Sequence, residues 1–172
     1  AAGTTMRTFF TGLTNCGAAE SGTNFLADPQ ISYDDQNDRW VLVMLRAEVT
    51  TAGALTQSWL CVACSQTADP RGTWNKYEIA DGAGLADYPH LGIGEDAIFV
   101  GTNHFSTAGS FDNANFLAIQ KSPGMYTGGA ITPRKFTAGT SIFTPQPAER
   151  RGYLQGQYPP AGTAHMFVVR GA

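Results

Sequence analysis

The sequence predicts an all-β protein assembled from repeated four-stranded units. Short β-rich runs alternate with turn-forming clusters, and the long 3.6-residue periodicity of helices is missing. The chain also repeats itself: Val41-Leu42-Val43 returns 57 residues later as Ile98-Phe99-Val100, and Trp59-Leu60 returns at the same offset as Phe116-Leu117. Repetition at a fixed period indicates a supersecondary unit that buries its faces by stacking on copies of itself.

A third echo precedes each of these blocks. Ala27-Asp28-Pro29-Gln30-Ile31 returns as Ala86-Asp87-Tyr88-Pro89-His90-Leu91, with Tyr88 as one inserted residue. This alignment places Asp87 at the position of Asp28 and His90 at the position of Gln30. We therefore expect these residues at the start of the first strand of each unit.

The strands are predicted from alternating apolar runs bounded by turn residues. The first unit should hold Pro29–Tyr33, Arg39–Ala47, Ser58–Gln66 and Trp74–Ile79. The second should hold Pro89–Ile93, Ala97–Asn103, Asn115–Lys121 and Ile131–Phe136. A partial third unit should hold Phe143–Gln146, Gly152–Gln155 and His165–Arg170, and one more strand is expected near Arg7–Thr11. Asp34–Asp38 and Gly94–Asp96 are predicted to be hairpin turns.

Four-stranded units of this kind are typical of β-propeller blades. The units are expected at 27–80, 86–137 and 143–172, after an N-terminal segment 1–26 that carries a strand of a neighbouring blade. Three blades cannot close a ring, so we expect a fragment of a larger propeller. The alternative is an assembly with a second copy, to which the strand near Met6–Thr11 contributes. A β-sandwich is the competing fold class.

Several motifs resemble a family of secreted bacterial β-propeller proteins, many of them hypothetical surface proteins. Asp28-Pro29 with Tyr33-Asp34 and Arg39-Trp40 resembles the opening of a blade in that family. Ser65-Gln66-Thr67-Ala68-Asp69-Pro70-Arg71-Gly72-Thr73-Trp74 and Asp87-Tyr88-Pro89 continue the pattern, so the likeness covers most of residues 25–172. The resemblance implies a propeller fold and a secreted or cell-surface location, and it implies no particular activity.

Composition narrows the classes of function. Charged residues make up 15% of the chain, Lys and Arg total 11 without a run, and the formal net charge is −3. Nucleic-acid binding needs clustered positive charge, so we expect no nucleic-acid partner. No apolar run approaches the length of a membrane span. The chain starts Ala1-Ala2-Gly3 without Met, which indicates a mature product or a fragment.

The three cysteines are Cys16, Cys61 and Cys64. On a strand, positions three residues apart point to opposite faces, so Cys61 and Cys64 cannot hold one metal ion together. One disulfide from Cys16 to either Cys61 or Cys64 and a set of buried free thiols both remain open.

The first strand of each blade lines the channel of a propeller, so its residues are the candidates for a site. The residues expected there are Asp28, Gln30, Asp87, His90 and Gln146. Asp28 and Asp87 would converge as candidate Ca²⁺ ligands, although the sequence requires no cofactor. The simpler interpretation is that both carboxylates accept backbone hydrogen bonds at the turn before proline. Asp28, Asp87 and His90 are also the candidate catalytic residues.

Ligand binding is expected from Tyr88 at the channel mouth and from a loop that follows His104. Phe105 and Phe111 flank that loop and would form its rim, while Gln30, His90 and Gln146 would contact the same ligand. No catalytic motif with a nucleophile elbow, zinc-binding helix or phosphate loop is present. The sequence therefore favours a binding module for carbohydrate or another surface partner over an enzyme. A glycan-acting hydrolase and a structural repeat domain of an envelope or appendage protein are the alternatives.

Overall fold

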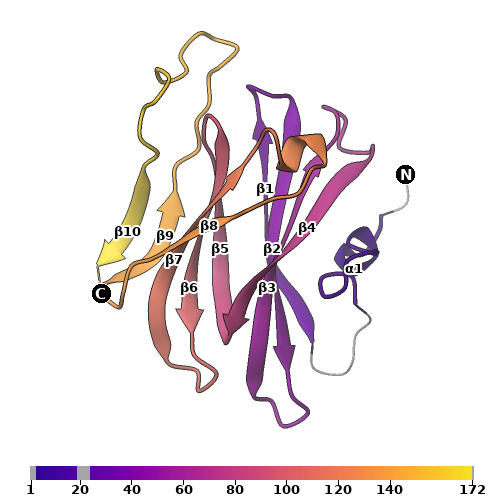
Figure 1. Cartoon of the computed structure of the whole chain (residues 1–172), viewed down its shortest axis with the longest axis vertical. Helices are drawn as coiled ribbons and strands as arrows, with labels where there is room; N and C mark the ends of the chain where they lie inside the picture. The colour runs from indigo at the N-terminus through magenta and orange to yellow at the C-terminus, as the bar shows by residue number, and fades with distance from the viewer. Residues whose placement is uncertain (1–2, 19–23, 172) are drawn as a thin grey trace.

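A computed structural model describes residues 3–18 and 24–171 and confirms the all-β fold class. Three antiparallel sheets lie side by side along the molecule, and the chain passes through them in order (Figure 1). Two of the sheets have four strands each, and the last has two. Consecutive strands are neighbours throughout, so every sheet is a simple meander.

The first sheet contains β1 (Phe25–Asp34), β2 (Arg39–Val49), β3 (Leu55–Ser65) and β4 (Trp74–Ala83). The second contains β5 (Leu85–Ile93), β6 (Ala97–Phe105), β7 (Phe111–Gln120) and β8 (Arg134–Thr137). The third contains β9 (Ile142–Pro147) and β10 (Phe167–Gly171). The other elements are a short helix α1 (Met6–Phe9) and a 3₁₀ turn η1 (Met125–Thr127). Most of the expected strands are thereby confirmed, although their bounds differ: most are longer than expected, whereas β8 and β10 are shorter.

The first strand of each sheet carries the same irregularity. Asp28, Tyr88 and Thr144 all have φ near +52°, each precedes a proline, and the pairing with the next strand shifts there in each sheet. Tyr88 is therefore the structural counterpart of Asp28. Asp87, which pairs with Asn103, takes the place of Ala27, which pairs with Leu45. The expected alignment of Asp87 with Asp28 is wrong, because the inserted residue lies before Asp87.

Strands β2 and β3 are buried on both faces of the first sheet. Val41, Val43 and Leu60 point into a core shared with the second sheet, whereas Leu42 and Met44 point to the opposite face. Alternating side chains leave a strand on opposite faces, so a run that is apolar throughout needs cover on both sides. This requirement explains why the second sheet packs on one face of the first sheet and the N-terminal segment on the other.

The second sheet covers one face of the first, and β9 covers the second sheet in turn. Strand β5 contacts β1, β2 and β3, while β9 contacts β5, β6 and β7. Glycine makes the second packing possible, because a Cβ on Gly101 would lie 1.8 Å from the carbonyl oxygen of Pro145. Aromatic rings complete this layer, with Phe116 and Phe167 at 4.8 Å between ring centroids.

The N-terminal segment covers the other face of the first sheet. The expected strand near Arg7–Thr11 is wrong: Met6–Phe9 is one helical turn, begun by Thr5, whose Oγ1 accepts a hydrogen bond from the Thr8 backbone N–H at 3.2 Å. Phe10 is fully buried beside the apolar face of β2 and β3. The segment therefore serves as a cover, and the expected strand exchange through Met6–Thr11 has no counterpart in this conformation. Among the described residues, no helix has the length and apolar character to span a membrane.

A disulfide joins the N-terminal segment to the sheet that it covers. Cys16 is bonded to Cys61 on β3, with 5.8 Å between the Cα atoms. Cys64 is a buried free thiol on the opposite face of the same strand, and burial raises its pKa to about 11. The expectation that Cys61 and Cys64 point to opposite faces is confirmed, and the open choice of pairing is resolved.

The expected strand Gly152–Gln155 is wrong. It belongs to a long loop, residues 148–166, that joins β9 to β10 and reaches back to the hairpin between β1 and β2 (Figure 1). The backbone N–H groups of Gly152 and Tyr153 donate to Oδ2 of Asp35 at 2.9 and 3.2 Å. These donors bind a carboxylate instead of a neighbouring strand, which explains why the segment forms a turn.

A buried ion pair joins the first two sheets at the end where their first strands finish. Lys121 Nζ lies 2.5 Å from Oδ2 of Asp34 and donates to the carbonyl oxygen of Gly94 at 2.6 Å. Tyr126 donates its hydroxyl to the same Asp34 oxygen at 2.8 Å. The Lys121 and Asp34 side chains are 3% and 1% exposed, so each charge depends on the other for its stability.

We predict that Cys16→Ser will destabilise the chain by roughly 2–4 kcal/mol, because the disulfide closes a long loop and its loss raises the entropy of the unfolded chain. The measurement is chemical denaturation under oxidising conditions. Adding a reductant should lower the stability of the wild type to that of the variant. Cys64→Ala is the matched control, since Cys64 lies outside the disulfide, and its stability should still respond to reductant. Equal stability of wild type and Cys16→Ser would contradict the prediction.

Candidate functional site

The candidate site lies where the first strands of the sheets begin, at the lower end of the stack in Figure 1. We call this the lower end; the turns between β2 and β3 and between β6 and β7 lie there. The structure brings four of the sequence-predicted residues together at this end: Asp28, Asp87, Tyr88 and His90. They come from β1 and β5, the first strands of adjacent sheets.

Backbone strain holds two of these residues. Asp28 and Tyr88 both have φ of 52°, in the left-handed region that residues with a side chain seldom occupy. Proline follows each of them, and a residue before proline is restricted further. Strained backbone of this kind persists only where the surrounding sheet imposes it, and such positions cluster at functional sites.

Tyr88 is the most exposed residue of this group. It is 46% exposed although it lies on a first strand, and it meets the His90 ring edge-on at 4.3 Å between centroids. His90 is 7% exposed, and its Nε2 has no hydrogen-bond partner among the described residues. The pair therefore presents an aromatic face with a buried imidazole beside it.

The charges of the group influence one another across the two sheets. Burial raises the pKa of Asp87, and the nearby Asp28 carboxylate raises it further, while a backbone hydrogen bond from Tyr88 opposes the shift. Burial lowers the pKa of His90, and Asp28 opposes that shift. On β5, the pKa of Asp87 is thus raised and that of His90 is lowered, which is the kind of perturbation that acid–base chemistry uses.

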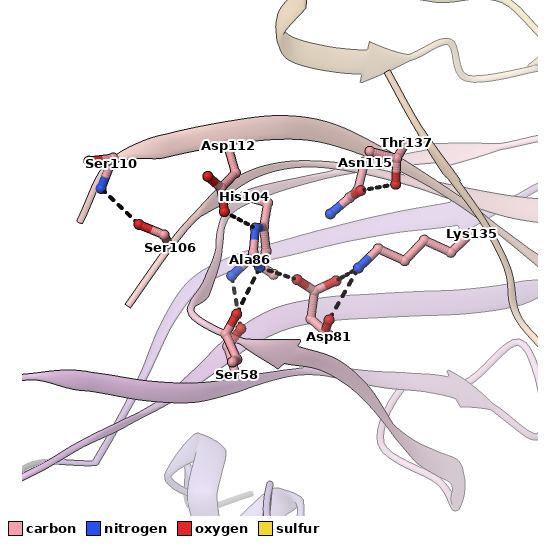
Figure 2. Close-up of polar contacts among 11 residues, drawn as sticks. Ser58, Asp81, Ala86, His104, Ser106, Ser110, Asp112, Asn115, Lys135 and Thr137 are labelled. Atoms are coloured by element: carbon pink, nitrogen blue, oxygen red, sulfur yellow. Dashed lines mark hydrogen bonds and ion pairs between the residues drawn. The ribbon is translucent and has the colours of Figure 1, made fainter. Parts of the chain in front are cut away.

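A second polar cluster at the same end joins the first two sheets (Figure 2). His104 on β6 lies with its Nε2 3.1 Å from the Ala83 carbonyl oxygen and 3.5 Å from Oδ2 of Asp81, and its Nδ1 is 3.7 Å from Oδ2 of Asp112. Lys135 on β8 donates to Oδ1 of Asp81 at 2.7 Å. Asp81 is 1% exposed, so its charge is held between a lysine and an imidazole from the neighbouring sheet.

Sequence reasoning found His104 but missed Asp81 beside it and Lys135, which pairs with Asp81. The predicted fourth strand of the first unit ended at Ile79, whereas β4 continues to Ala83 and carries Asp81 into the interface. Lys135 lies on β8, and in the sequence it looks like a solvated residue. Asp81 and Lys135 meet only because the two sheets pack against each other, and no local pattern in the sequence indicates that packing.

Phe105 and Phe111 do not join the Tyr88 group. The expected loop after His104 is a tight turn, in which the Ser106 carbonyl accepts a hydrogen bond from Gly109 N at 2.9 Å. Phe111 packs against Phe143 of β9 at 4.9 Å between ring centroids. The two rings therefore contribute to the packing of the second sheet on the third, and their expected part in ligand binding stays a prediction.

Gln30 and Gln146 occupy the position of His90 in the other two sheets. Each of the three residues directly follows the proline at which the strand pairing shifts. Gln146 is exposed and Gln30 is half-buried. Asn103 fixes the third irregularity to the second sheet, because its Oδ1 accepts from the Thr144 backbone N–H at 2.7 Å. The residue that follows the proline is thus equivalent in the three first strands.

Calcium binding at Asp28 and Asp87 requires more oxygen ligands than these two carboxylates supply. Within residues 3–18 and 24–171, no group of three or more His, Cys, Asp or Glu side chains is placed to hold a metal ion. The chemistry that this end offers is hydrogen bonding, aromatic stacking and proton transfer by Asp28, Asp87 and His90.

We predict that Asp87→Asn will make the folded chain more stable at neutral pH. The pKa of Asp87 is raised in the folded state, so its neutral carboxyl group is tolerated at low pH, whereas ionisation as pH rises through the folded pKa costs the folded state stability. The advantage of the variant should therefore vanish near pH 3. Thermal unfolding across this range measures it, with Asp96→Asn at an exposed hairpin as the control. A variant less stable than wild type at pH 7 would contradict the prediction.

Comparison of the chain with protein-family models, curated proteins and solved structures finds no match. The likeness to secreted bacterial propeller proteins consequently stays a resemblance of motifs. What the chain does must be argued from the geometry of its lower end.

Proposed function

We propose that the stacked sheets are blades of a β-propeller and that the chain is a secreted or cell-surface module that binds carbohydrate at its lower end. Three supports favour the propeller: the identical irregularity in each first strand, the four-stranded meanders, and the placement of each first strand against the preceding sheet. The Cys16–Cys61 disulfide is consistent with an oxidising compartment outside the cytosol.

The proposal rests on one observation: the Tyr88 ring is held in an exposed position by a strained backbone. The exposed Tyr88 ring lies beside the Asp28 and Asp87 carboxylates, so this surface offers a ligand an aromatic face together with hydrogen-bond acceptors. Aromatic faces stack on the apolar face of sugar rings. The Asp28 and Asp87 carboxylates beside Tyr88 can accept hydrogen bonds from sugar hydroxyls, which fix the orientation of the ligand.

Completion of the propeller is part of this proposal. The third sheet has two strands where the others have four, and β10 presents exposed apolar side chains at Val168 and Val169, next to the exposed Met166. A bare sheet edge of this kind requires a partner strand. The remaining blades of a larger propeller supply it in this interpretation, and a second copy of the chain is the alternative.

We predict that Tyr88→Ala will weaken glycan binding by at least about tenfold, or about 1.4 kcal/mol, because the stacking surface is lost. A glycan array identifies the ligand, and titration calorimetry then compares the variants. Phe136→Ala is the matched control, since Phe136 is an exposed ring on β8 that is 59% exposed. Binding by Phe136→Ala should equal that of wild type. A wild-type chain that binds no glycan on the array would favour a purely structural role and contradict the proposal.

A glycan-acting hydrolase is the second candidate, favoured by the raised pKa of Asp87 beside the Asp28 carboxylate. Glycoside hydrolysis uses one protonated and one ionised carboxyl group on either side of the scissile bond. If the chain is a hydrolase, Asp87→Asn should lower turnover of the array-identified glycan by at least about 10²-fold, because the general acid is lost. Reducing-sugar release measures it. Binding without release by wild type would exclude this candidate and retain the binding module.

A further inference from the structure

A lysine and an aspartate are enclosed together between the first two sheets. Asp34 is the last residue of β1, and Lys121 directly follows β7 of the second sheet. Water barely reaches the two side chains, which are 1% and 3% exposed, and Nζ lies 2.5 Å from Oδ2. Reacting atoms need an approach of about 3–3.5 Å. Cγ of Asp34 lies only one bond beyond Oδ2, so the amine nitrogen is held close to a carboxyl carbon.

The pair of Lys135 with Asp81 offers a comparison among the described residues. Lys135 Nζ lies 2.7 Å from Oδ1 of Asp81, but the Lys135 side chain is 36% exposed, so water reaches its ammonium group. Lys121 lacks this solvation: burial lowers its pKa, and the hydrogen bond and charge of Asp34 oppose the shift. A buried lysine with a lowered pKa reaches its neutral, nucleophilic amine form more readily.

Two further donors point at the carboxylate oxygen that Lys121 contacts. Tyr126 donates its hydroxyl to Oδ2 of Asp34 at 2.8 Å, and Nδ2 of Asn37 donates to the same oxygen at 3.0 Å. Burial raises the pKa of Tyr126, and the Asp34 charge raises it further, so the hydroxyl keeps its proton and remains a donor. Such donors stabilise the negative charge that develops on an oxygen when a nucleophile attacks the adjacent carbon.

The surrounding groups also match an amide in place of the ion pair. Nζ of Lys121 donates to the carbonyl oxygen of Gly94 at 2.6 Å, and an amide N–H at that atom keeps this bond. Oδ2 as an amide oxygen keeps Tyr126 and Asn37 as its donors. A buried ion pair carries the desolvation cost of two charges, whereas an amide is neutral. Burial therefore favours the amide over the separate charged groups.

We propose that Lys121 and Asp34 form an intramolecular amide bond, a covalent modification that joins the first two sheets. One proton of the Lys121 ammonium group passes to the carboxylate, and the resulting amine attacks Cγ of Asp34. The bond from Nζ to Cγ forms and the bond from Cγ to Oδ1 breaks. A second proton from Nζ passes to Oδ1, which leaves as water. One amide and one water molecule are the products, so the step needs no oxidant, reductant or co-reactant.

Intact-mass spectrometry of the purified full chain, denatured and reduced, tests for this bond. The wild-type chain should be lighter than its sequence by one water molecule, and peptide mapping should find a branched peptide in which Asp34 is joined to Lys121. Lys121→Arg keeps the positive charge but lacks the amine, so its mass should equal that of its sequence. Lys135→Arg is the matched control, and it should still be lighter by one water molecule.

A wild-type mass equal to that of the sequence would show an ion pair only and would overturn the proposal. Loss of water at another position, such as ring closure of Asp81 onto the backbone of Gly82, would also overturn it, because ring closure gives no branched peptide. The wild-type measurement needs no variant, so the bond is tested even if Lys121→Arg does not fold. Absence of the bond would leave the proposed carbohydrate binding at the lower end unaffected.

Discussion

The need to cover two apolar faces of one sheet governs how this chain is arranged. Strands β2 and β3 bury side chains on both sides, so the first sheet is unstable in water unless something packs on each face. The second sheet covers one face. The N-terminal segment covers the other, where Phe10 is fully buried and Cys16 is bonded to β3. The two faces of the first sheet are therefore covered by different kinds of structure, a sheet on one and a short helical segment on the other.

On one side of the stacked layers, the outermost layer is the N-terminal segment, which is attached covalently. On the other side, β9 and β10 cover the second sheet but leave Met166 and Val168 exposed. Stacked repeats usually need a polar or covered surface at each end. In the described residues, the side covered by the N-terminal segment meets that requirement, whereas the side formed by β9 and β10 keeps exposed apolar side chains.

Most strands could be predicted from the sequence because short β-rich runs bounded by turn residues are a local property. Val41 to Val43 and their counterparts near Val100 show both the strand type and the repeat. The helical turn at Met6 was not predictable in this way, since four residues are too few for helical periodicity to appear. The misalignment of Asp87 has a similar origin: matching letters suggested one insertion point, whereas the positive φ before each proline defines another.

Candidate site residues were predictable only where the repeat located them. Asp28, Asp87, Tyr88 and His90 belong to the repeated first strand, so their gathering followed from strand order. Asp81 and Lys135 meet because two sheets face each other, and Gly152 meets Asp35 because a long loop folds back. Such contacts join residues far apart in sequence, and their residue types resemble those of ordinary solvated turns.

The disulfide has a consequence for how β3 acquires its orientation. Cys61 and Cys64 are three positions apart, so turning β3 over by a slip of one residue would present the wrong sulfur to Cys16. The bond with Cys61 can form only after the strand has adopted its native facing. Once formed, the Cys16–Cys61 bond therefore holds β3 in its native facing.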